Sequence, residues 1–470
     1  MAKAIVIGGG PVGLATAMLL AKRGLRVVVL DREAPAPMEV RDLWTSWERR
    51  SVAQFHQVHF LQPAATALLG EHLPEVLEGM AAAGVGEINI PELTAAAMGT
   101  SREDADFSRF VTRTTCRRPF MEFGFVTAAR AHADVEIRCA SPVIGLVMGA
   151  EAIEGVPHVI GVKTESGDTY LADVVIDASG RRTAVPSLLE SVGARAPEEH
   201  TSESGFVYNS RYYKGDAIPE FRGDSLAAIG SISLLTLPGD HGHWSVTFYH
   251  SPKDKAMRKV RDPEVFERVV RSLPLHEHWL DGEPVSQVHS MAAAANTSRE
   301  YAVDGQPVVT GLVPVGDAWG FTNPSLGRGI CLGLKHAVDV VDDIAGTLDD
   351  PAAMARAWDR RTRDGAERWH NATVAFEEIR AAQVDSFRAG LPDPFDASEV
   401  NAAVGRAFAS ASHYDADVLA WYNEVAGCYS LPMSVVSRPG VLDKILEVAA
   451  AHPAYETPGP TRGQLEGLLV

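Results

Sequence analysis

A glycine-rich turn near the amino terminus has the residue types that bind a dinucleotide. Gly8, Gly10 and Gly13 follow a short apolar run, and Asp31 comes at the end of the next apolar run. Such glycines allow a tight turn and bring the backbone close to a pyrophosphate, while the amino terminus of the following helix supplies N–H donors. An acidic residue in the place of Asp31 accepts hydrogen bonds from ribose hydroxyls. The pattern predicts a dinucleotide site but does not by itself distinguish FAD from NAD.

Two later segments also combine glycine with aspartate in apparent turns, as the N-terminal segment does. Residues 177–180 (DASG) directly follow an apolar run, and taken alone they indicate only a turn after a strand. Residues 315–318 (VGDA) and 323–329 (NPSLGRG) lie far along the chain and precede a helical run. A simple Gly-Asp turn before a helix would leave the Pro-x-x-Gly-x-Gly pattern of this last segment unexplained.

The last segment resembles the ribityl-binding motif of the p-hydroxybenzoate hydroxylase-like flavoproteins, whose FAD-binding fold is of the glutathione-reductase type. The resemblance implies that Asp317 bonds the ribityl chain of FAD and that Pro324 sits beside the isoalloxazine. Gly327 and Gly329 would bring backbone N–H groups and a helix amino terminus to the part of the flavin where negative charge accumulates on reduction. Cys331 stands where this family often has Asn, which removes one polar contact.

Three more segments carry the resemblance. Residues 177–180 resemble the family's Asp-Gly segment, in a variant found in epoxidases, halogenases and geranylgeranyl reductases of the superfamily. Residues 47–56 (WERRSVAQFH) resemble its arginine-x-glycine-x-proline-glutamine region, with Ser51 and Ala53 replacing Gly and Pro. Residues 118–122 (RPFME) resemble a helix start whose arginine reaches the FAD phosphates. In this order the resemblance covers the whole chain, and it is closest to bacterial flavoproteins related to polyether epoxidases.

The residues expected to bind FAD come from all of these segments. They are Gly8, Gly10, Pro11, Val12, Gly13, Asp31, Arg32, Arg50, Gln54, Arg118, Val143, Asp177, Gly180, Gly316, Asp317, Pro324, Gly327, Gly329 and Ile330. Trp319 and Phe321, with Pro324, are candidates for an apolar wall facing the flavin, although core packing explains the two aromatic residues equally well. No side chain is identified as a catalytic acid or base.

The elements that must position these residues indicate an α/β protein. Residues 4–7 and 26–30 predict buried strands on either side of a helix at residues 14–22. Aromatic and β-branched runs predict a separate antiparallel sheet that could form one wall of a substrate cavity; they are residues 205–213, 225–237 and 243–250. Helical composition dominates from about residue 329 onward.

A discontinuous domain arrangement follows from the order of these segments. We expect a Rossmann-like FAD-binding domain interleaved with an antiparallel-sheet substrate domain, followed by a helical C-terminal region. The FAD-binding domain comprises residues 1–75, 112–198 and 290–350. The substrate domain comprises residues 76–111 and 199–289, and the helical region comprises residues 351–470.

The composition and net charge of the chain restrict the classes of binding partner that we expect. The chain has 470 residues, and its 61 acidic and 43 basic residues give a formal charge of -18, which disfavours nucleic acids and anionic membranes as partners. Its four cysteines form no Cys-x-x-Cys pair, so no disulfide framework or metal site is expected and a reducing cytoplasm fits best. Residues 4–21 superficially resemble a signal peptide, but the glycines would break its helix. No other run is long and apolar enough to span a bilayer, so a soluble protein is expected.

The resemblance implies monooxygenation through a C4a-peroxyflavin, with molecular oxygen as co-substrate. The acceptor would be an apolar, aromatic or polyene small molecule that is hydroxylated or epoxidised. Electrons would come from NAD(P)H directly or from a separate flavin reductase. Two alternatives remain open: an FAD-dependent carbon-carbon reductase or dehydrogenase of the geranylgeranyl-reductase type, and a non-catalytic prenyl- or nucleotide-binding carrier. A halogenase is disfavoured because the sequence has no Trp-x-Trp-x-Ile-Pro motif. Substrate identity and oligomeric state stay open.

Overall fold

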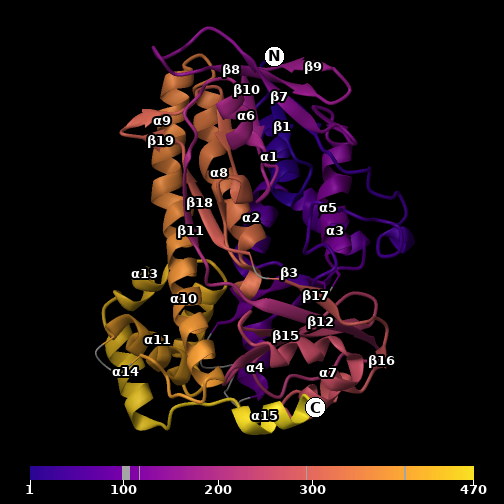
Figure 1. Ribbon diagram of the computed structural model, residues 1–470, viewed down its shortest axis with the longest axis vertical. Coiled ribbons are helices and arrows are strands. Elements are labelled where there is room, and N and C mark those ends of the chain that lie inside the picture. Colours follow the sequence, from indigo (N-terminus) through magenta and orange to yellow (C-terminus); the bar gives the residue numbers. More distant parts are fainter. Residues whose placement is uncertain (98–105, 116, 293, 396–398) are drawn as a thin grey trace.

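The fold places a parallel sheet and an antiparallel sheet in two adjoining regions of one molecule. The computed structural model describes residues 1–97, 106–115, 117–292, 294–395 and 399–470. In Figure 1 the parallel sheet occupies the upper region, and the antiparallel sheet lies below it beside the C-terminal helices. The predicted α/β class, with an antiparallel sheet and C-terminal helices, is confirmed. The domain boundaries given above stay a prediction.

The parallel sheet has five strands in the order β21-β10-β1-β2-β6. These strands are β1 (Lys3–Ile7), β2 (Arg26–Leu30), β6 (Val135–Arg138), β10 (Val174–Asp177) and β21 (Leu312–Pro314). Ile7 pairs with both Leu30 and Asp177, and Asp177 pairs with Pro314. The carboxyl ends of the central strands therefore lie side by side, where open α/β sheets bind their ligands.

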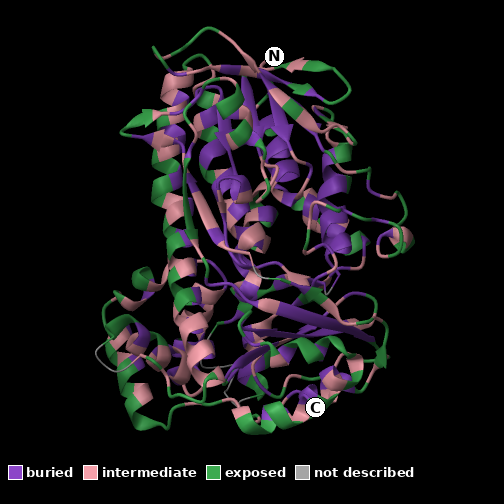
Figure 2. Ribbon diagram, viewed as in Figure 1, coloured by how far each residue is buried: buried purple, intermediate pink, exposed green. Residues whose placement is uncertain are grey.

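Apolar side chains explain the position of this sheet in the core. The inner strands are rich in Val and Ile and are buried, as is typical of a parallel sheet covered by helices on its faces. Figure 2 shows these strands as an almost continuous buried region. Helix α1 (Pro11–Lys22) begins with Pro at its first turn, a position that tolerates the missing N–H. It packs against α5 (Arg118–Ala131) and α8 (Gly329–Gly346).

The antiparallel sheet has its strands in the order β13-β14-β15-β12-β16, with β17 also paired to β12. These strands are β12 (Val207–Lys214), β13 (Leu226–Ile229), β14 (Ile232–Pro238), β15 (His243–His250), β16 (Glu283–Pro284) and β17 (His289–Met291). The run at residues 225–237, expected as one strand, is a hairpin. Its turn contains Gly230, whose φ of 51° is in the left-handed region.

Short sheets surround these two. They comprise β3 (His59–Phe60), β5 (Thr112–Thr115) and β4 (Gly86–Ile88); β7 (Val143–Met148), β8 (Val159–Thr164) and β9 (Thr169–Leu171); β11 (Glu198–Ser202), β18 (Asn296–Glu300) and β22 (Gly320–Phe321); and β19 (Ala302–Val303) with β20 (Gln306–Pro307). The apolar run at residues 169–176 divides between β9, which pairs with β8, and β10 of the parallel sheet.

The remaining helices cover these sheets. They are α2 (Pro63–His72), α3 (Pro74–Ala82), α4 (Ile90–Ala97), α6 (Val185–Ser191), α7 (Pro263–Val270), α9 (Pro351–Thr362), α10 (Arg368–Arg388), α11 (Val400–Ala411), α12 (Ala416–Ala426), α13 (Pro432–Val436), α14 (Val441–Ala451) and α15 (Arg462–Leu468). Val76 and Met80 of α3 are buried in the core that contains the parallel sheet. In Figure 1, α10 extends from beside the upper region down to the C-terminal helices, so it can contribute side chains to a site between the regions.

The described cysteines are free thiols, and the described helices and side chains were compared with the requirements of membrane spans and metal sites. Cys139, Cys331 and Cys428 carry free thiols, and Cys116 lies outside the described residues. Among the residues that the structure describes, no helix combines the length and apolar character needed to cross a bilayer, and no group of three or more His, Cys, Asp or Glu is arranged to hold a metal ion.

Candidate functional site

One large cavity joins the three glycine-containing segments to the antiparallel sheet. Its volume is about 1570 Å³. Small-molecule pockets are commonly about 300–1,000 Å³, so this cavity has room for more than one ligand of ordinary size. Its lining includes Gly10, Gly180 and Pro324 from the three segments and Leu235 and Tyr249 from the sheet. The three segments are distant in sequence but line the same cavity.

The N-terminal turn is shaped by its glycines. Gly8 has a φ of 105°, and a Cβ there would lie 2.5 Å from the carbonyl oxygen of Ala178. A Cβ at Gly13 would lie 2.0 Å from the carbonyl oxygen of Gly8. At Gly10, by contrast, a Cβ would meet nothing within 4 Å, and the residue lines the cavity. Two glycines thus close the turn, while the third leaves open space beside the helix amino terminus, which fits a pyrophosphate.

Asp31 belongs to a buried ionic network at the edge of this turn. Its carboxylate accepts a hydrogen bond from Arg49 Nη2 at 2.7 Å, and Arg49 Nη1 donates to Glu122 and to the carbonyl oxygen of Gly9, each at 2.9 Å. Burial alone would raise the pKa of Glu122, but Arg118 and Arg49 hold that pKa below its usual value. Because a carboxylate has about four lone-pair sites, Asp31 can still accept from a ribose hydroxyl.

Arg118 extends this network into the cavity wall. Its Nε donates to Glu122, and its Nη1 lies 3.0 Å from His59 Nε2. The other ring nitrogen of His59 lies 2.8 Å from the carbonyl oxygen of Gln57, so it carries the proton and Nε2 accepts. Burial, reinforced by the charge of Arg118, lowers the pKa of His59 to about 3. His59 is therefore a neutral ring that fixes the orientation of the Arg118 guanidinium.

Asp177 organises the second segment from within the core. One oxygen accepts from the backbone N–H of Ser179 at 3.0 Å and from its hydroxyl at 2.5 Å, and the other accepts from the Thr183 hydroxyl at 2.6 Å. Burial raises the pKa of Asp177. These bonds hold the turn in which Gly180 lines the cavity. Gly180 has a φ of 84°, and a Cβ there would meet nothing within 4 Å, so the turn leaves space for a ligand.

The third segment brings Asp317 and two glycines to the cavity wall. Gly316 is buried, and its N–H donates to His336 Nδ1 at 3.3 Å. Asp317 lines the cavity, and among the described residues it has no hydrogen-bond donor. Burial raises its pKa to about 6, although Arg118 and Arg181 act in the opposite direction. Such a carboxyl fits a ligand that brings its own hydroxyl donors, as a ribityl chain does.

A buried carboxyl lies directly behind this segment. Ser325, which lines the cavity, donates a hydrogen bond to Glu377 of α10, and Asn296 Nδ2 donates to the other oxygen at 2.8 Å. Burial raises the pKa of Glu377 to about 7, against the effect of these two hydrogen bonds. Tyr208 on β12 donates to Asn323 Oδ1 at 2.6 Å. These bonds fix the backbone on both sides of Pro324.

Most of the sequence-predicted residues line the cavity. They are Gly8, Gly10, Pro11, Val12, Gly13, Asp31, Arg32, Gln54, Arg118, Val143, Gly180, Asp317, Phe321, Pro324, Gly327, Gly329 and Ile330. Asp177 and Gly316 lie behind the wall, as described above. Their roles as FAD ligands stay predictions.

The structure does not bring Arg50 or Trp319 to the cavity. The Arg50 side chain is 90% exposed and pairs with Glu48 at 3.8 Å. The neighbouring Arg49 is the arginine of this region that is buried in the wall. Trp319 packs edge-on between His336 and His370, with ring centroids 5.5 and 5.8 Å away, so core packing accounts for it. Phe321 does line the cavity, with the guanidinium of Arg181 5.3 Å from its ring centroid.

Sequence reasoning missed Arg49, His59, Ser325 and Glu377. Arg49 and Arg50 are adjacent, so their sequence gives no signal of which one turns inward. The sequence around His59 has no third residue at metal-ligand spacing and fits a surface histidine or one that covers the flavin, so it does not indicate a partner of Arg118. Glu377 is one of three acidic residues on the long helix α10, and exposure is the usual outcome for such residues.

Comparisons with known proteins agree with this geometry. Residues 3–39 match the model of the family "FAD dependent oxidoreductase". Protein Rv3254 of Mycobacterium tuberculosis is 27% identical over 364 residues, which cover 70% of each chain. The family match covers the first glycine turn and Asp31, where the dinucleotide site is predicted.

Solved flavoproteins share the fold. A flavoprotein/dehydrogenase from Cytophaga hutchinsonii superposes with a TM-score of 0.62 at 14% identity, over 96% of this chain and 99% of that one. PqsL of Pseudomonas aeruginosa, described as a probable FAD-dependent monooxygenase, gives a TM-score of 0.59 at 15% identity, over 82% of this chain and 96% of that one. At these identities the likeness establishes the fold.

Proposed function

We propose that this protein is an FAD-dependent monooxygenase that inserts one oxygen atom into an apolar, aromatic or polyene small molecule. The observation that carries the proposal is the single cavity of about 1570 Å³, which runs from the dinucleotide turn to the face of the antiparallel sheet. A cavity of this size accommodates the cofactor and an organic substrate together. The description of PqsL as a probable FAD-dependent monooxygenase supports the same chemistry.

The residues present fit FAD at one end of the cavity. The helix amino terminus beside Gly10 suits the pyrophosphate, Asp31 suits the ribose and Asp317 suits the ribityl chain. Backbone N–H groups near Gly327 and Gly329 suit the isoalloxazine, and the left-handed φ of 61° at Gly327 turns the chain before α8. When bound and reduced, FAD supplies the electrons that activate molecular oxygen.

The other end of the cavity would hold the organic substrate. Its wall on the antiparallel sheet includes Leu235, Leu237, Thr247, Tyr249 and Met291. Such a surface binds an apolar or aromatic molecule by excluding water from it. Exclusion of water also protects reactive oxygen species from unproductive decay.

Glu377 and Ser325 could hold a proton at the junction of the two ends. A carboxyl whose pKa is raised to about 7 is present in both protonation states near neutral pH. Ser325 Oγ donates to Oε1 of Glu377 and also lines the cavity. When the carboxyl is protonated this hydrogen bond would reverse, so that Oε1 donates to Oγ of Ser325 while the Ser325 hydroxyl passes its own proton to a ligand. Oxygen insertion releases the second oxygen atom as water and needs such a proton source.

We further propose that NAD(P)H or a separate flavin reductase supplies the electrons. The sequence contains one glycine fingerprint of the dinucleotide type, at residues 8–13. A nicotinamide nucleotide would therefore visit the flavin transiently, without a second Rossmann site of its own.

Oxygen uptake and isotope incorporation test the function. FAD-loaded protein is mixed under labelled oxygen gas with NADH, NADPH or chemically reduced flavin and a panel of aromatic and polyene compounds. We expect oxygen uptake coupled to a product that carries one labelled oxygen atom, with Asp317→Asn as the control that loses flavin. Turnover of the same compounds without oxygen would instead support the carbon-carbon reductase. A colourless protein that binds no added FAD would support the carrier.

A further inference from the structure

Arg380 is a buried cation in the cavity wall without an acidic partner. It lies on α10, is 8% exposed and lines the cavity. Among the described residues no carboxylate forms an ion pair with it. A buried charge that lacks a partner is costly, and burial lowers the pKa of Arg380. The cost is removed if a ligand supplies the negative charge.

The contacts of Arg380 leave one side of its guanidinium available. Its Nη2 donates to the carbonyl oxygens of Ile232 at 2.9 Å and Gly230 at 3.3 Å and to the Ser233 hydroxyl at 3.0 Å. Its Nε also donates to Ser233 at 3.3 Å. Nη1 has no acceptor among the described residues. The protein therefore fixes Nε and Nη2 of this cavity-lining residue and leaves Nη1 without an acceptor among the described residues.

The acidic residues around Arg380 are already engaged. Asp393, whose charge acts on Arg380, accepts from Gln383 at 2.8 Å and pairs with Arg406 at 3.5 Å. Glu377, one turn earlier on α10, is bound by Ser325 and Asn296. Asp224 in the cavity lining pairs with His413 at 2.9 Å.

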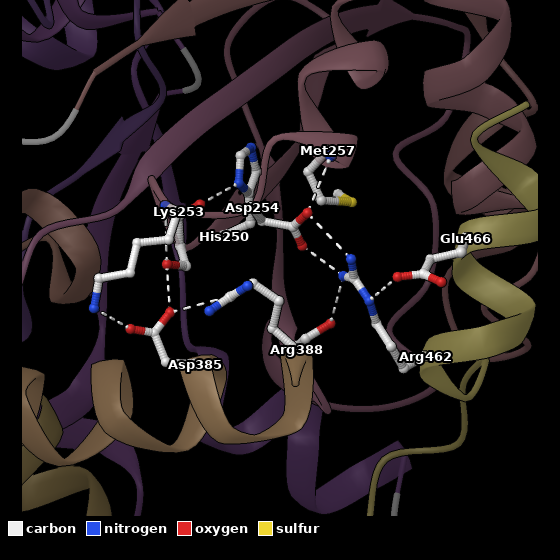
Figure 3. A network of polar contacts seen from close by, with 10 residues as sticks. His250, Lys253, Asp254, Met257, Asp385, Arg388, Arg462 and Glu466 are labelled. Atoms are coloured by element: carbon white, nitrogen blue, oxygen red, sulfur yellow. Dashed lines mark hydrogen bonds and ion pairs between the residues drawn. The ribbon is translucent and has the colours of Figure 1, made fainter. Parts of the chain in front are cut away.

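A second arginine at the same turn, Arg462, differs from Arg380 because it has acidic partners. Arg462 of α15 donates to the Ser231 hydroxyl at 3.3 Å, so it contacts the same β13–β14 turn as Arg380. Arg462 pairs with Asp254, which is buried, and with Glu466 at 2.9 Å (Figure 3). Nearby, Asp385 of α10 binds Lys253 at 2.6 Å. The arginine that holds this turn from outside the cavity is neutralised, whereas the one inside it is not.

We propose that Arg380 binds a carboxylate at the far end of an otherwise apolar substrate. This inference rests on the proposed function, because it takes the opposite end of the substrate to be the one that reacts. One carboxylate oxygen can accept from Nη1 of Arg380, and the neighbouring wall, with Leu226, Leu235 and Ile379, suits an apolar body. A phosphate would call for further cationic partners at this point.

The sheet sets the length of that substrate. Ser233, Tyr249 and Tyr208 are directly paired across three adjacent strands. Two strand spacings separate Ser233, which Arg380 contacts, from Tyr208, which contacts Asn323 beside Pro324. At about 4.8 Å per spacing the two backbone positions are roughly 10 Å apart, and we take a length of this order for the apolar body of the substrate. Two aromatic rings, or an aliphatic chain of similar length, span this distance.

Calorimetric binding of two matched probes tests the inference. The probes are biphenyl-4-carboxylate and its neutral amide, titrated into FAD-loaded wild-type protein and into Arg380→Met, Arg380→Lys and Arg462→Met. We expect the wild-type protein to bind the acid at least about tenfold more tightly than the amide, since hydrogen bonds to charged groups are the stronger ones. Arg380→Met should abolish the preference, and Arg462→Met should keep it.

The outcomes separate this inference from the proposed function. Equal binding of acid and amide, failure of the acid to bind, or a preference that survives Arg380→Met would overturn the role of Arg380. If Arg380→Met does not fold, Arg380→Lys decides: a preference reduced at least about threefold supports the role, and an unchanged one overturns it. Binding needs no turnover, so a retained preference in a protein that incorporates no oxygen would overturn the monooxygenase proposal and not the carboxylate site.

Discussion

Ser325 in the cavity wall donates a hydrogen bond to the buried carboxyl of Glu377. This contact joins two segments that are 52 residues apart and connects the core to the region expected to face the flavin. Among the contacts described above, Glu377 is the acidic residue of α10 that is hydrogen-bonded to a neighbour of Pro324.

Glu377 should make stability depend on pH. Its pKa is about 7 in the folded protein against 4.5 as the ordinary value, so folding favours the neutral form. The resulting stabilisation is complete below about pH 4.5 and is lost as pH rises through 7. Relative to Glu377→Gln, the wild-type protein should lose about 3 kcal/mol of unfolding free energy over this interval. Thermal melting of both proteins between pH 5 and pH 8 checks this, and parallel curves would contradict it.

Substitution of Arg49 and of its neighbour Arg50 should have very different effects on the free energy of unfolding. Arg49→Met leaves Asp31 and Glu122 buried without their shared cation and should cost about 3–5 kcal/mol of unfolding free energy. Arg50→Met removes an exposed side chain and should change the free energy by no more than about 0.5 kcal/mol. Urea unfolding curves of the two variants provide the comparison. Similar losses in both would show that the ionic network is not stabilising.

Asp317 should govern flavin retention. Asp317→Ala removes a cavity carboxyl that has no donor from the described part of the protein, so the fold should survive while FAD affinity falls at least about tenfold. The ratio of flavin to protein absorbance after gel filtration measures the loss. The exposed Asp349→Ala serves as a control that should keep its flavin. A variant at position 317 that retains full flavin would rule out the assigned ribityl contact.

His59 should remain neutral throughout the physiological range. Burial and the nearby Arg118 lower its pKa to about 3, so the folded state disfavours the proton. The associated stability is present above the ordinary pKa of 6.5 and is lost as pH falls below it. Nitrogen chemical shifts of the His59 imidazole should stay constant from pH 8 to pH 5. Titration of His59 near pH 6 would contradict the geometry.

Local sequence patterns predicted strands β1 and β2 of the parallel sheet, and most of the residues expected to bind FAD line the cavity. The first glycine turn and Asp31 were recognisable because a strand, a turn and a helix follow one another within thirty-one residues. Asp317 and Pro324 were recognisable by the resemblance of their short motif. Both predicted binding motifs are made of residues that are close in sequence, so the local sequence is enough to recognise them.

The missed features depend on contacts between distant segments. Whether Arg49 or Arg50 turns inward is set by Glu122 and Asp31, which the local sequence does not place. The burial of Glu377 and Arg380 follows from the packing of α10 against Ser325 and the β13–β14 turn. Gly230 and Ser231 are a local signal of that turn, but the apolar residues on both sides of them favoured one continuous strand.

We propose that three segments distant in sequence form one FAD site. A crystal structure of the protein saturated with FAD tests this most directly. We predict the isoalloxazine against residues 324–329, the ribityl chain at Asp317, and the adenosine ribose at Asp31. Flavin bound elsewhere, or a cavity without flavin at saturating FAD, would contradict the account.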